Sequence, residues 1–324
     1  MNSKQEKLRV GVVGVGHLGQ YHVQKYAALH EAELVGVLDV DRAKADDVAQ
    51  RCGTRAFQDL DSLLGEVDAV SLAVPTENHF EEALKILDRD VHLLVEKPIT
   101  YRVDHAATLV ESARRKSLIL QVGHVERFSP PVIKMTSLLK APLFIECHRM
   151  NVFTVRGTDV DVVLDLMIHD LDIVLNAVHS PVLELHAVGM KVLTGTTDIA
   201  NARLIFGNGT AANLTASRVS NKTLRKIRVF QPDAYISVNC ARRDISITRM
   251  NGSLDIANRN PEVVTSKLTY PESDPLADQI SSFVRAVLTG SDPVVSGEDG
   301  RLALEVALQI MDQIEQGCKH FKYV

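Results

Sequence analysis

The sequence predicts an α/β protein in which a doubly wound parallel sheet is followed by an α+β domain with a large, mainly antiparallel sheet. Three observations support this prediction. Apolar runs alternate with helical patterns in the first third of the chain, a glycine-rich turn follows the first run, and apolar and polar residues alternate after residue 182. We expect the first domain over residues 1–122 and the second over residues 123–324.

The first domain is predicted from five short runs rich in Val, Leu and Ile. Near-continuous apolar strands separated by amphipathic helices are typical of a parallel sheet that is covered on both faces. The runs are LRVGVVGV (8–15), ELVGVLD (33–39), DAVSLAV (68–74), VHLLVEK (91–97) and LILQVG (118–123). Such sheets bind ligands at the edge formed by the carboxyl ends of their strands.

The second domain is predicted from a change of pattern after Gly123. Ser129-Pro130-Pro131 is typical of a helix start, LFIECHRM (143–150) predicts a strand, and DVVLDLMIHDLDIVL (161–175) predicts a helix. Residues 182–250 alternate apolar and polar side chains, which indicates an antiparallel sheet. Further signals are turns at Gly207-Asn208-Gly209 and Pro232-Asp233, a helix from Asp274-Pro275 to Gly290, and a helix from about Glu298 to Gly317.

Composition excludes several classes of function. The 324 residues are 45% hydrophobic and 24% charged, with a net charge of -5, so the chain has no general attraction for nucleic acid or anionic lipid. The N-terminus lacks the apolar core of a signal peptide, and no apolar run reaches the length of a membrane span, so we expect a cytoplasmic protein. The four cysteines form no CxxC pair, and we predict neither a disulfide nor a metal site.

A glycine fingerprint follows the first predicted strand. Gly14-x-Gly16-x-x-Gly19 stands at the start of a helix, with His17 and Leu18 between the last two glycines. The first glycine permits a tight turn, the second lets the backbone approach a pyrophosphate, and the third allows close helix packing. The same pattern also occurs in strand-to-helix turns that bind nothing, so a second signal is needed.

Asp39, at the end of the next strand, supplies that signal. A carboxylate at this spacing accepts the ribose hydroxyls of NAD, and it repels the 2′-phosphate of NADP. We therefore predict a dinucleotide site of the Rossmann type that takes NAD, although Arg42 close by leaves NADP possible. Taken alone, Asp39 is equally typical of a helix N-cap, a role that Asp41 can fill as well.

Glu96-Lys97-Pro98 lies at the carboxyl end of a predicted parallel strand. Oxidation of an alcohol by hydride transfer needs a base for the hydroxyl proton, and a Lys or His with a tuned pKa supplies one. Lys97 is therefore a candidate for that role, and its alternative is a surface salt bridge.

The helix predicted over residues 161–175 carries a polar stripe. At 100° per residue, Asp161, Asp165, His169 and Asp172 share one face with Asn176, while Asp170 faces away. Asp is a poor helix former, so this stripe needs a reason beyond exposure to solvent. Asp165 and His169 stand four residues apart, which lets a carboxylate fix an imidazole tautomer. An ordinary amphipathic helix stays the alternative.

Taken in chain order, these motifs resemble the glucose-fructose oxidoreductase, inositol dehydrogenase and rhizopine-catabolism (Gfo/Idh/MocA) family. The similarity rests on the glycine fingerprint, Asp39, AVPTENH, Glu96-Lys97-Pro98, GHVERFSP and the Asp-x-x-x-His helix, and it spans essentially the whole chain. It implies that Lys97, Asp165 and His169 are catalytic and that a cis peptide precedes Pro98. It also implies cofactor contacts from Pro75, Thr76, Asn78, His79, Glu96 and Lys97.

Within the family, the chain is most similar to the UDP-N-acetylglucosamine 3-dehydrogenases. This implies oxidation of C3 of a UDP-N-acetyl amino sugar, with Arg127, Arg149 and Arg156 available for the diphosphate. His124 and Phe128 are open to two interpretations, packing or contact with substrate and nicotinamide. The expected substrate contacts are Lys97, His124, Arg127, Arg156, Asp165 and His169. The family also implies a homodimer or homotetramer built on an exposed sheet face.

Two other functions stay open from the residues. NVFTVRGTDVDV departs from the Pro-rich stretch of the nucleotide-sugar enzymes, so a dehydrogenase for a free polyol or sugar, such as inositol or glucose, is the first alternative. A sensor that binds NAD(H) or a sugar without turnover is the second.

Overall fold

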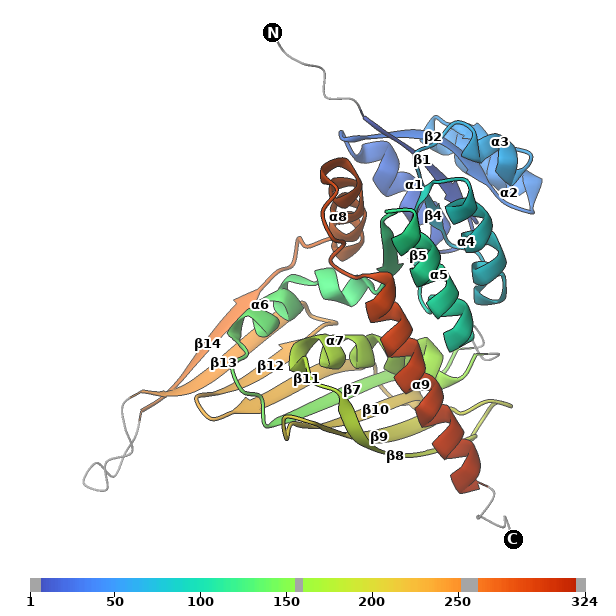
Figure 1. Cartoon of the computed structure of the whole chain (residues 1–324). Coiled ribbons are helices and arrows are strands. Elements are labelled where there is room, and N and C mark those ends of the chain that lie inside the picture. Colours follow the sequence, from blue (N-terminus) through green and yellow to red (C-terminus); the bar gives the residue numbers. More distant parts are fainter. Residues whose placement is uncertain (1–6, 155–159, 252–261, 319–324) are drawn as a thin grey trace. The chain divides into compact units, whose positions relative to one another are not determined.

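The computed structural model describes residues 7–154, 160–251 and 262–318. The chain forms two compact units (Figure 1). Unit 1 comprises Met1–Val125 and Asp274–Leu304, and unit 2 comprises Glu126–Ser273 and Glu305–Val324. The predicted boundary at 122/123 lies close to the first change of unit, whereas the return of residues 274–304 to unit 1 has no counterpart in the predicted division.

Unit 1 is built on a six-stranded sheet in the order β3-β2-β1-β4-β5-β6, with every pair parallel. The strands are β1 (Leu8–Val13), β2 (Ala32–Leu38), β3 (Arg55–Ala56), β4 (Ala69–Leu72), β5 (His92–Glu96) and β6 (Leu120–Gly123). The helices between them are α1 (Gly19–Ala28), α2 (Arg42–Cys52), α3 (Leu60–Leu64), η1 (Thr76–Asn78), α4 (His79–Asp88) and α5 (Val103–Arg115). The order reverses direction between β1 and β4, which creates the crevice where doubly wound sheets bind dinucleotides.

Helix α8 (Pro275–Thr289) completes the core of unit 1. Asp274 caps it by accepting from the backbone N–H of Ala277, and Gly290 ends it in the left-handed conformation. Its buried Ile280 and Phe283 join a cluster with Val10, Val12 and Tyr26. A segment 150 residues beyond β6 therefore contributes apolar side chains to the first sheet.

Helix α9 (Gly297–Cys318) follows, and its first turns belong to unit 1. Gly300 lies so close to β6 that an added Cβ would stand 2.6 Å from the Val122 side chain.

Unit 2 is built on an eight-stranded sheet in the order β14-β13-β12-β11-β7-β10-β9-β8. The pair β7–β10 is parallel and the other neighbours are antiparallel, which confirms a mainly antiparallel sheet. The strands are β7 (Phe144–Val152), β8 (Val182–Met190), β9 (Ile199–Phe206), β10 (Ala211–Ser220), β11 (Leu224–Gln231), β12 (Ala234–Asn239), β13 (Asp244–Asn251) and β14 (Glu262–Thr269).

Helices cover one face of this sheet (Figure 1). Helix α6 (Pro130–Leu138) contacts β12 and β13, and α7 (Ile168–Val178) contacts β7 and β10. Beneath α7 the sheet carries small, fully buried residues such as Ala212 and Ala216, which let the helix lie close to the strands. A short turn, η2 (Val125–Phe128), precedes α6.

The C-terminal part of α9 covers the edge strand β8. The Gln313 amide accepts from the Ala187 N–H at 2.7 Å and donates to the Leu185 carbonyl at 2.6 Å. The Cys318 thiol donates to the Gly189 carbonyl at 3.6 Å. Among the described helices, none combines the length and the apolar character needed to cross a membrane.

Candidate active site

The carboxyl edge of the six-stranded sheet brings together most of the residues predicted to bind the cofactor. The glycine turn follows β1, Asp39 follows β2, Pro75 and Thr76 follow β4, and Lys97 follows β5. These strands are neighbours in one parallel sheet, so their ends share one edge. That edge, at the point where strand order reverses, is the ligand-binding position of the fold.

The glycine turn has the geometry that a pyrophosphate requires. Gly14 has a φ of 83°, and a Cβ on Gly19 would stand 1.8 Å from the Gly14 carbonyl oxygen, so neither position accepts a side chain. A Cβ on Gly16 would meet nothing within 4 Å, which leaves open space beside this backbone. No side chain caps the start of α1, so the positive end of the helix dipole is not neutralised by a capping group at this turn. The residues present therefore fit a bound dinucleotide phosphate.

Asp39 is held beside this turn by two backbone donors. Its carboxylate accepts from the N–H of Val15 at 2.8 Å and from that of Asp41 at 2.9 Å, which uses two of about four acceptor sites. Asp41, not Asp39, caps α2 by accepting from Lys44. The Arg42 guanidinium donates to the Phe57 carbonyl at 2.7 Å and to Asp46 at 3.2 Å. Asp39 thus keeps acceptor capacity for ribose hydroxyls.

The AVPTENH segment places exposed and buried residues at the same edge. Pro75 and Asn78 are exposed and Thr76 is half-buried, while His79 is 1% exposed. The His79 ring lies 2.9 Å from the Pro98 carbonyl oxygen and 3.0 Å from that of Val74. Burial lowers the pKa of His79, which disfavours the charged ring. Its side chain thus joins the ends of β4 and β5, and its predicted contact with the cofactor stays a prediction.

A buried chain of hydrogen bonds ends beside Lys97. Tyr26 Oη lies 2.9 Å from Ser71 Oγ, Ser71 Oγ lies 3.2 Å from His22 Nδ1, and His22 Nε2 lies 3.1 Å from a Glu96 oxygen. The other Glu96 oxygen accepts from the Lys97 N–H at 3.2 Å. Burial acts to raise the pKa of Glu96, but the bonds and charges of His22 and Lys97 together outweigh it, so the pKa of this carboxyl lies below its ordinary value.

This arrangement turns Glu96 inward and leaves Lys97 half-buried at the sheet edge, with a cis peptide between Lys97 and Pro98. The cis bond implied by the family resemblance is thereby confirmed. His124, after β6, is 1% exposed.

Unit 2 supplies the Asp-x-x-x-His segment in a modified form. Residues Val163–Met167 form a π-helix, η3, which continues directly into α7. Asp165 lies in the π-helical turn and His169 in the first turn of α7, and both are half-buried. The stripe drawn on an ideal α-helix is therefore correct only in part, because the wider turn changes the direction of the side chains that follow it. Such insertions are frequent at functional sites.

The later aspartates of the segment are buried structural ties. Asp170 is 3% exposed and pairs through both oxygens with Arg149 of β7, at 2.7 and 3.1 Å. The same guanidinium donates to Glu126 at 2.9 Å. Asp172 is 2% exposed and lies 3.4 Å from Arg127. Asp172 is therefore buried although it belongs to the predicted stripe, so a place on the stripe does not mean exposure to solvent.

Arg149 stabilises the negative charges of Asp170 and Glu126, and the two carboxyl pKa values respond differently. Burial raises the pKa of Asp170 above its ordinary value, and Arg149 offsets only part of this rise. For Glu126 burial acts in the same direction, but Arg149, helped by Arg225 and Cys240, outweighs it, and the pKa lies below its ordinary value. Arg149 thus bonds to two carboxylates in the interior, which is tolerable only while all three stay in contact.

The three arginines expected around the substrate differ in their surroundings. Arg149 is buried and bound to Asp170 and Glu126, so it is not available for a diphosphate. Arg127 is 9% exposed and pairs with Asp172, and Phe128 is 4% exposed, which agrees with packing. Arg156 lies outside the described residues. Among the described side chains no group of three or more His, Cys, Asp or Glu is arranged to hold a metal ion.

Comparison with known proteins bears on this geometry. Residues 8–124 match the model "Oxidoreductase family, NAD-binding Rossmann fold", and residues 146–237 match the Gfo/Idh/MocA C-terminal domain. The chain is 37% identical over 316 residues to the UDP-N-acetylglucosamine 3-dehydrogenase of Acidithiobacillus ferrooxidans, covering 95% of this chain and 97% of that protein. The chain belongs to the Gfo/Idh/MocA family of oxidoreductases.

Two solved structures agree with the fold, and a further sequence relative is similar along the chain. The A. ferrooxidans enzyme has a TM-score of 0.89 at 36% identity, covering 96% of this chain and 99% of that one. A scyllo-inositol dehydrogenase from Lactobacillus casei, solved with NAD(H) and scyllo-inositol, has a TM-score of 0.80 at 19% identity, covering 96% and 98% of the two chains. The myo-inositol 2-dehydrogenase of Thermotoga maritima is 24% identical over 336 residues, covering 95% and 97%.

Several residues that shape this Gfo/Idh/MocA site are not evident from the sequence. His22 follows Gly19 by three residues on a helix and is indistinguishable there from a surface histidine. Glu126 lies in GHVERFSP, which by itself assigns it no role, and Asp198 stands in a segment without a recognisable motif. Their signal is burial, which only the fold supplies.

We predict that Arg149→Met destabilises the protein by about 3–5 kcal/mol, because Asp170 and Glu126 would stay buried without their cation. Unfolding in urea, followed by circular dichroism because the chain has no tryptophan, measures this loss. Arg203→Met on β9 of the same sheet is the matched control, since Arg203 is exposed and bonds only to Asn213 in the contacts described, and it should change stability by less than about 1 kcal/mol. Equal effects in both variants would contradict the argument.

Proposed function

We propose that this protein is an NAD-dependent dehydrogenase that oxidises the C3 hydroxyl of a UDP-N-acetyl amino sugar. The observation that carries the proposal is the identity of 37% along nearly the whole length of a UDP-N-acetylglucosamine 3-dehydrogenase. Inositol dehydrogenases of the same family stand further away, at 24% over a comparable length. The glycine turn, Asp39, Lys97 and the Asp165–His169 pair support the same reaction class.

The proposed chemistry assigns each side chain one task. The glycine turn and Asp39 would hold NAD, which would supply the acceptor for the hydride that leaves C3. The hydroxyl proton passes to His169 or Lys97, Asp165 holds the His169 ring in one orientation, and Lys97 polarises the substrate oxygen. Glu96 and His22 fix the backbone from which Lys97 projects, through the bonds described above.

The preference for NAD over NADP rests on Asp39 and Arg42. A 2′-phosphate would meet the Asp39 carboxylate, which two backbone donors hold in place. Arg42, the nearby cation that would offset this repulsion, is already bonded to Phe57 and Asp46.

The substrate is tested by incubating the purified protein with NAD and, separately, UDP-N-acetylglucosamine, UDP-glucose, inositol and glucose. Adding 2-oxoglutarate re-oxidises NADH that stays bound, and mass spectrometry detects the keto-sugar as a loss of two hydrogens. We expect product from UDP-N-acetylglucosamine alone. Product only from inositol or glucose would favour a dehydrogenase for free polyols, and no product from any compound would favour a sensor.

We predict that Lys97→Met and His169→Ala each lower turnover at least about a hundredfold, because each removes a group needed for proton transfer, and that His169→Ala leaves NAD binding unchanged. Turnover and the dissociation constant of NAD are measured separately. Lys85→Met is the matched control, since Lys85 is an exposed α4 residue paired with Glu82. Full turnover in both test variants would remove these residues from the mechanism.

We predict that Asp39→Asn raises kcat/KM with NADP relative to NAD by at least about tenfold, because the amide no longer repels the 2′-phosphate. The ratio of the two kcat/KM values is the measurement. Asp41→Asn keeps a good helix cap and should leave the ratio unchanged. An unchanged ratio in Asp39→Asn would show that another group selects the cofactor.

A further inference from the structure

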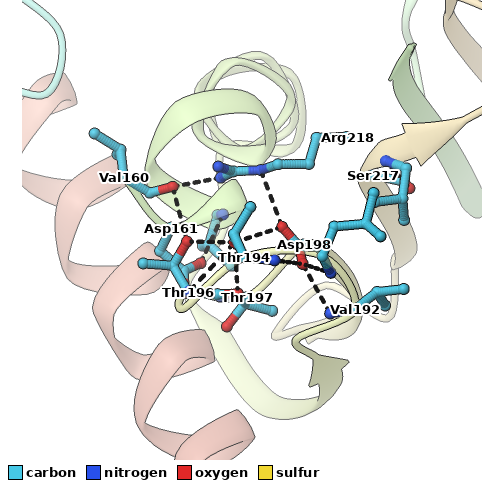
Figure 2. A network of polar contacts seen from close by, with 12 residues as sticks. Val160, Asp161, Val192, Thr194, Thr196, Thr197, Asp198, Ser217 and Arg218 are labelled. Carbon is cyan, nitrogen blue, oxygen red and sulfur yellow. Dashed lines mark hydrogen bonds and ion pairs between the residues drawn. The ribbon is translucent and has the colours of Figure 1, made fainter. Parts of the chain in front are cut away.

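The loop between β8 and β9 contains a heavily bonded buried carboxylate that the proposed chemistry does not use. Asp198 is 0% exposed. One of its oxygens accepts from three successive backbone N–H groups, those of Val192, Leu193 and Thr194, at 2.7, 2.6 and 2.9 Å. The other oxygen accepts from the Thr194 hydroxyl at 2.6 Å and faces Arg218 Nε at 3.8 Å (Figure 2).

This bonding exceeds what a strand connection needs. Two-residue turns join antiparallel strands without any buried charge, and burying a carboxylate is costly unless donors surround it. The loop is therefore held in one conformation for a reason other than joining β8 to β9, and its contacts with residues 160–162 supply that reason.

The opposite side of the loop holds the start of the Asp-x-x-x-His segment. The Thr197 N–H donates to Asp161 at 3.2 Å, and the Thr197 carbonyl accepts from the Val162 N–H at 3.1 Å. The Thr196 hydroxyl and the Arg218 guanidinium both donate to the Val160 carbonyl (Figure 2). Three consecutive residues, 160–162, are thus bonded to the loop or to the arginine that pairs with Asp198.

The two oxygens of Asp161 do different work. Oδ1 accepts from the Val163 N–H at 2.9 Å and so caps the segment that follows. Oδ2 accepts from Thr197 and belongs to the contact with the loop. An asparagine has one acceptor oxygen and serves only one of these two donors, whichever way its amide turns.

We propose that Asp198 and Arg218 are positioning residues that anchor residues 160–162 and thereby fix the positions of Asp165 and His169. The inference rests on the proposed function for its catalytic consequence. Asp165 follows the anchored residues by three positions and lies in a π-helical turn. Such a turn is intrinsically less favourable than an α-helical one, so its register depends on neighbouring contacts. Displacement of a catalytic group by about 1 Å costs on the order of a hundredfold in rate.

The test uses two variants and one control in the full-length protein. Asp198→Asn removes one acceptor oxygen from the loop, and Asp161→Asn leaves one acceptor oxygen for the N–H groups of Val163 and Thr197. Asp233→Asn, in the exposed turn after β11, is the control, since Asp233 pairs with Lys140 far along the sheet from this loop. Amide hydrogen exchange of peptides covering residues 160–169 is measured together with kcat and the KM for NAD.

We expect both test variants to raise exchange in residues 160–169 and to lower kcat about tenfold or more at an unchanged KM for NAD. The control should change none of these values. Unchanged exchange in Asp161→Asn overturns the anchoring role, even if Asp198→Asn does not fold. Raised exchange with full kcat also overturns it, because the contacts would then stabilise the segment without positioning it.

Failure of the proposed function gives a different result. If the wild-type protein oxidises none of the four sugars, that function is excluded, while the exchange measurement, which needs no substrate, still decides whether Asp198 anchors residues 160–162.

Discussion

The contact of Arg149 with Asp170 and Glu126 is the constraint on which the second unit depends. It joins the central strand β7 to α7 through a guanidinium that is 2% exposed, with three hydrogen bonds of 2.7 to 3.1 Å. If α7 slid along the sheet or rotated on it, a buried charge would lose its partner. The free energy of leaving that charge unpaired restricts the position of the helix more than apolar packing does. The orientation of the neighbouring His169 follows from that restriction.

In unit 1 a buried chain of hydrogen bonds, which ends at the Glu96 carboxylate, holds a helix and two strands in place. Tyr26, Ser71 and His22 connect α1 and β4 to Glu96, the residue before Lys97. The helix that carries the glycine turn and the strand that carries Lys97 therefore share one buried network. A substitution that moves α1 would break hydrogen bonds of this network and so shift the backbone at Lys97, because buried polar groups have no water to replace a lost partner.

The sequence was sufficient for the fold and for the candidate residues at the ends of strands. Apolar runs, the glycine spacing and turn signals such as Gly207-Asn208-Gly209 depend on local chemistry, and the corresponding elements lie where they are expected. The stripe on residues 161–175 was interpreted less well, because a π-helical turn and the ion pairs of Asp170 and Asp172 depend on residues distant in sequence. Arg149 gave the same signal as a ligand-binding arginine, and only its inward position on β7 distinguishes the two.

Gln313 has a consequence for how copies of this chain can associate. An edge strand presents unpaired N–H and C=O groups that can accept a strand from another molecule. On β8 the Gln313 amide occupies such a pair, the Ala187 N–H and the Leu185 carbonyl, as a single side chain that imitates an added strand. Growth of the sheet past β8 into a continuous intermolecular sheet is thereby blocked at these residues.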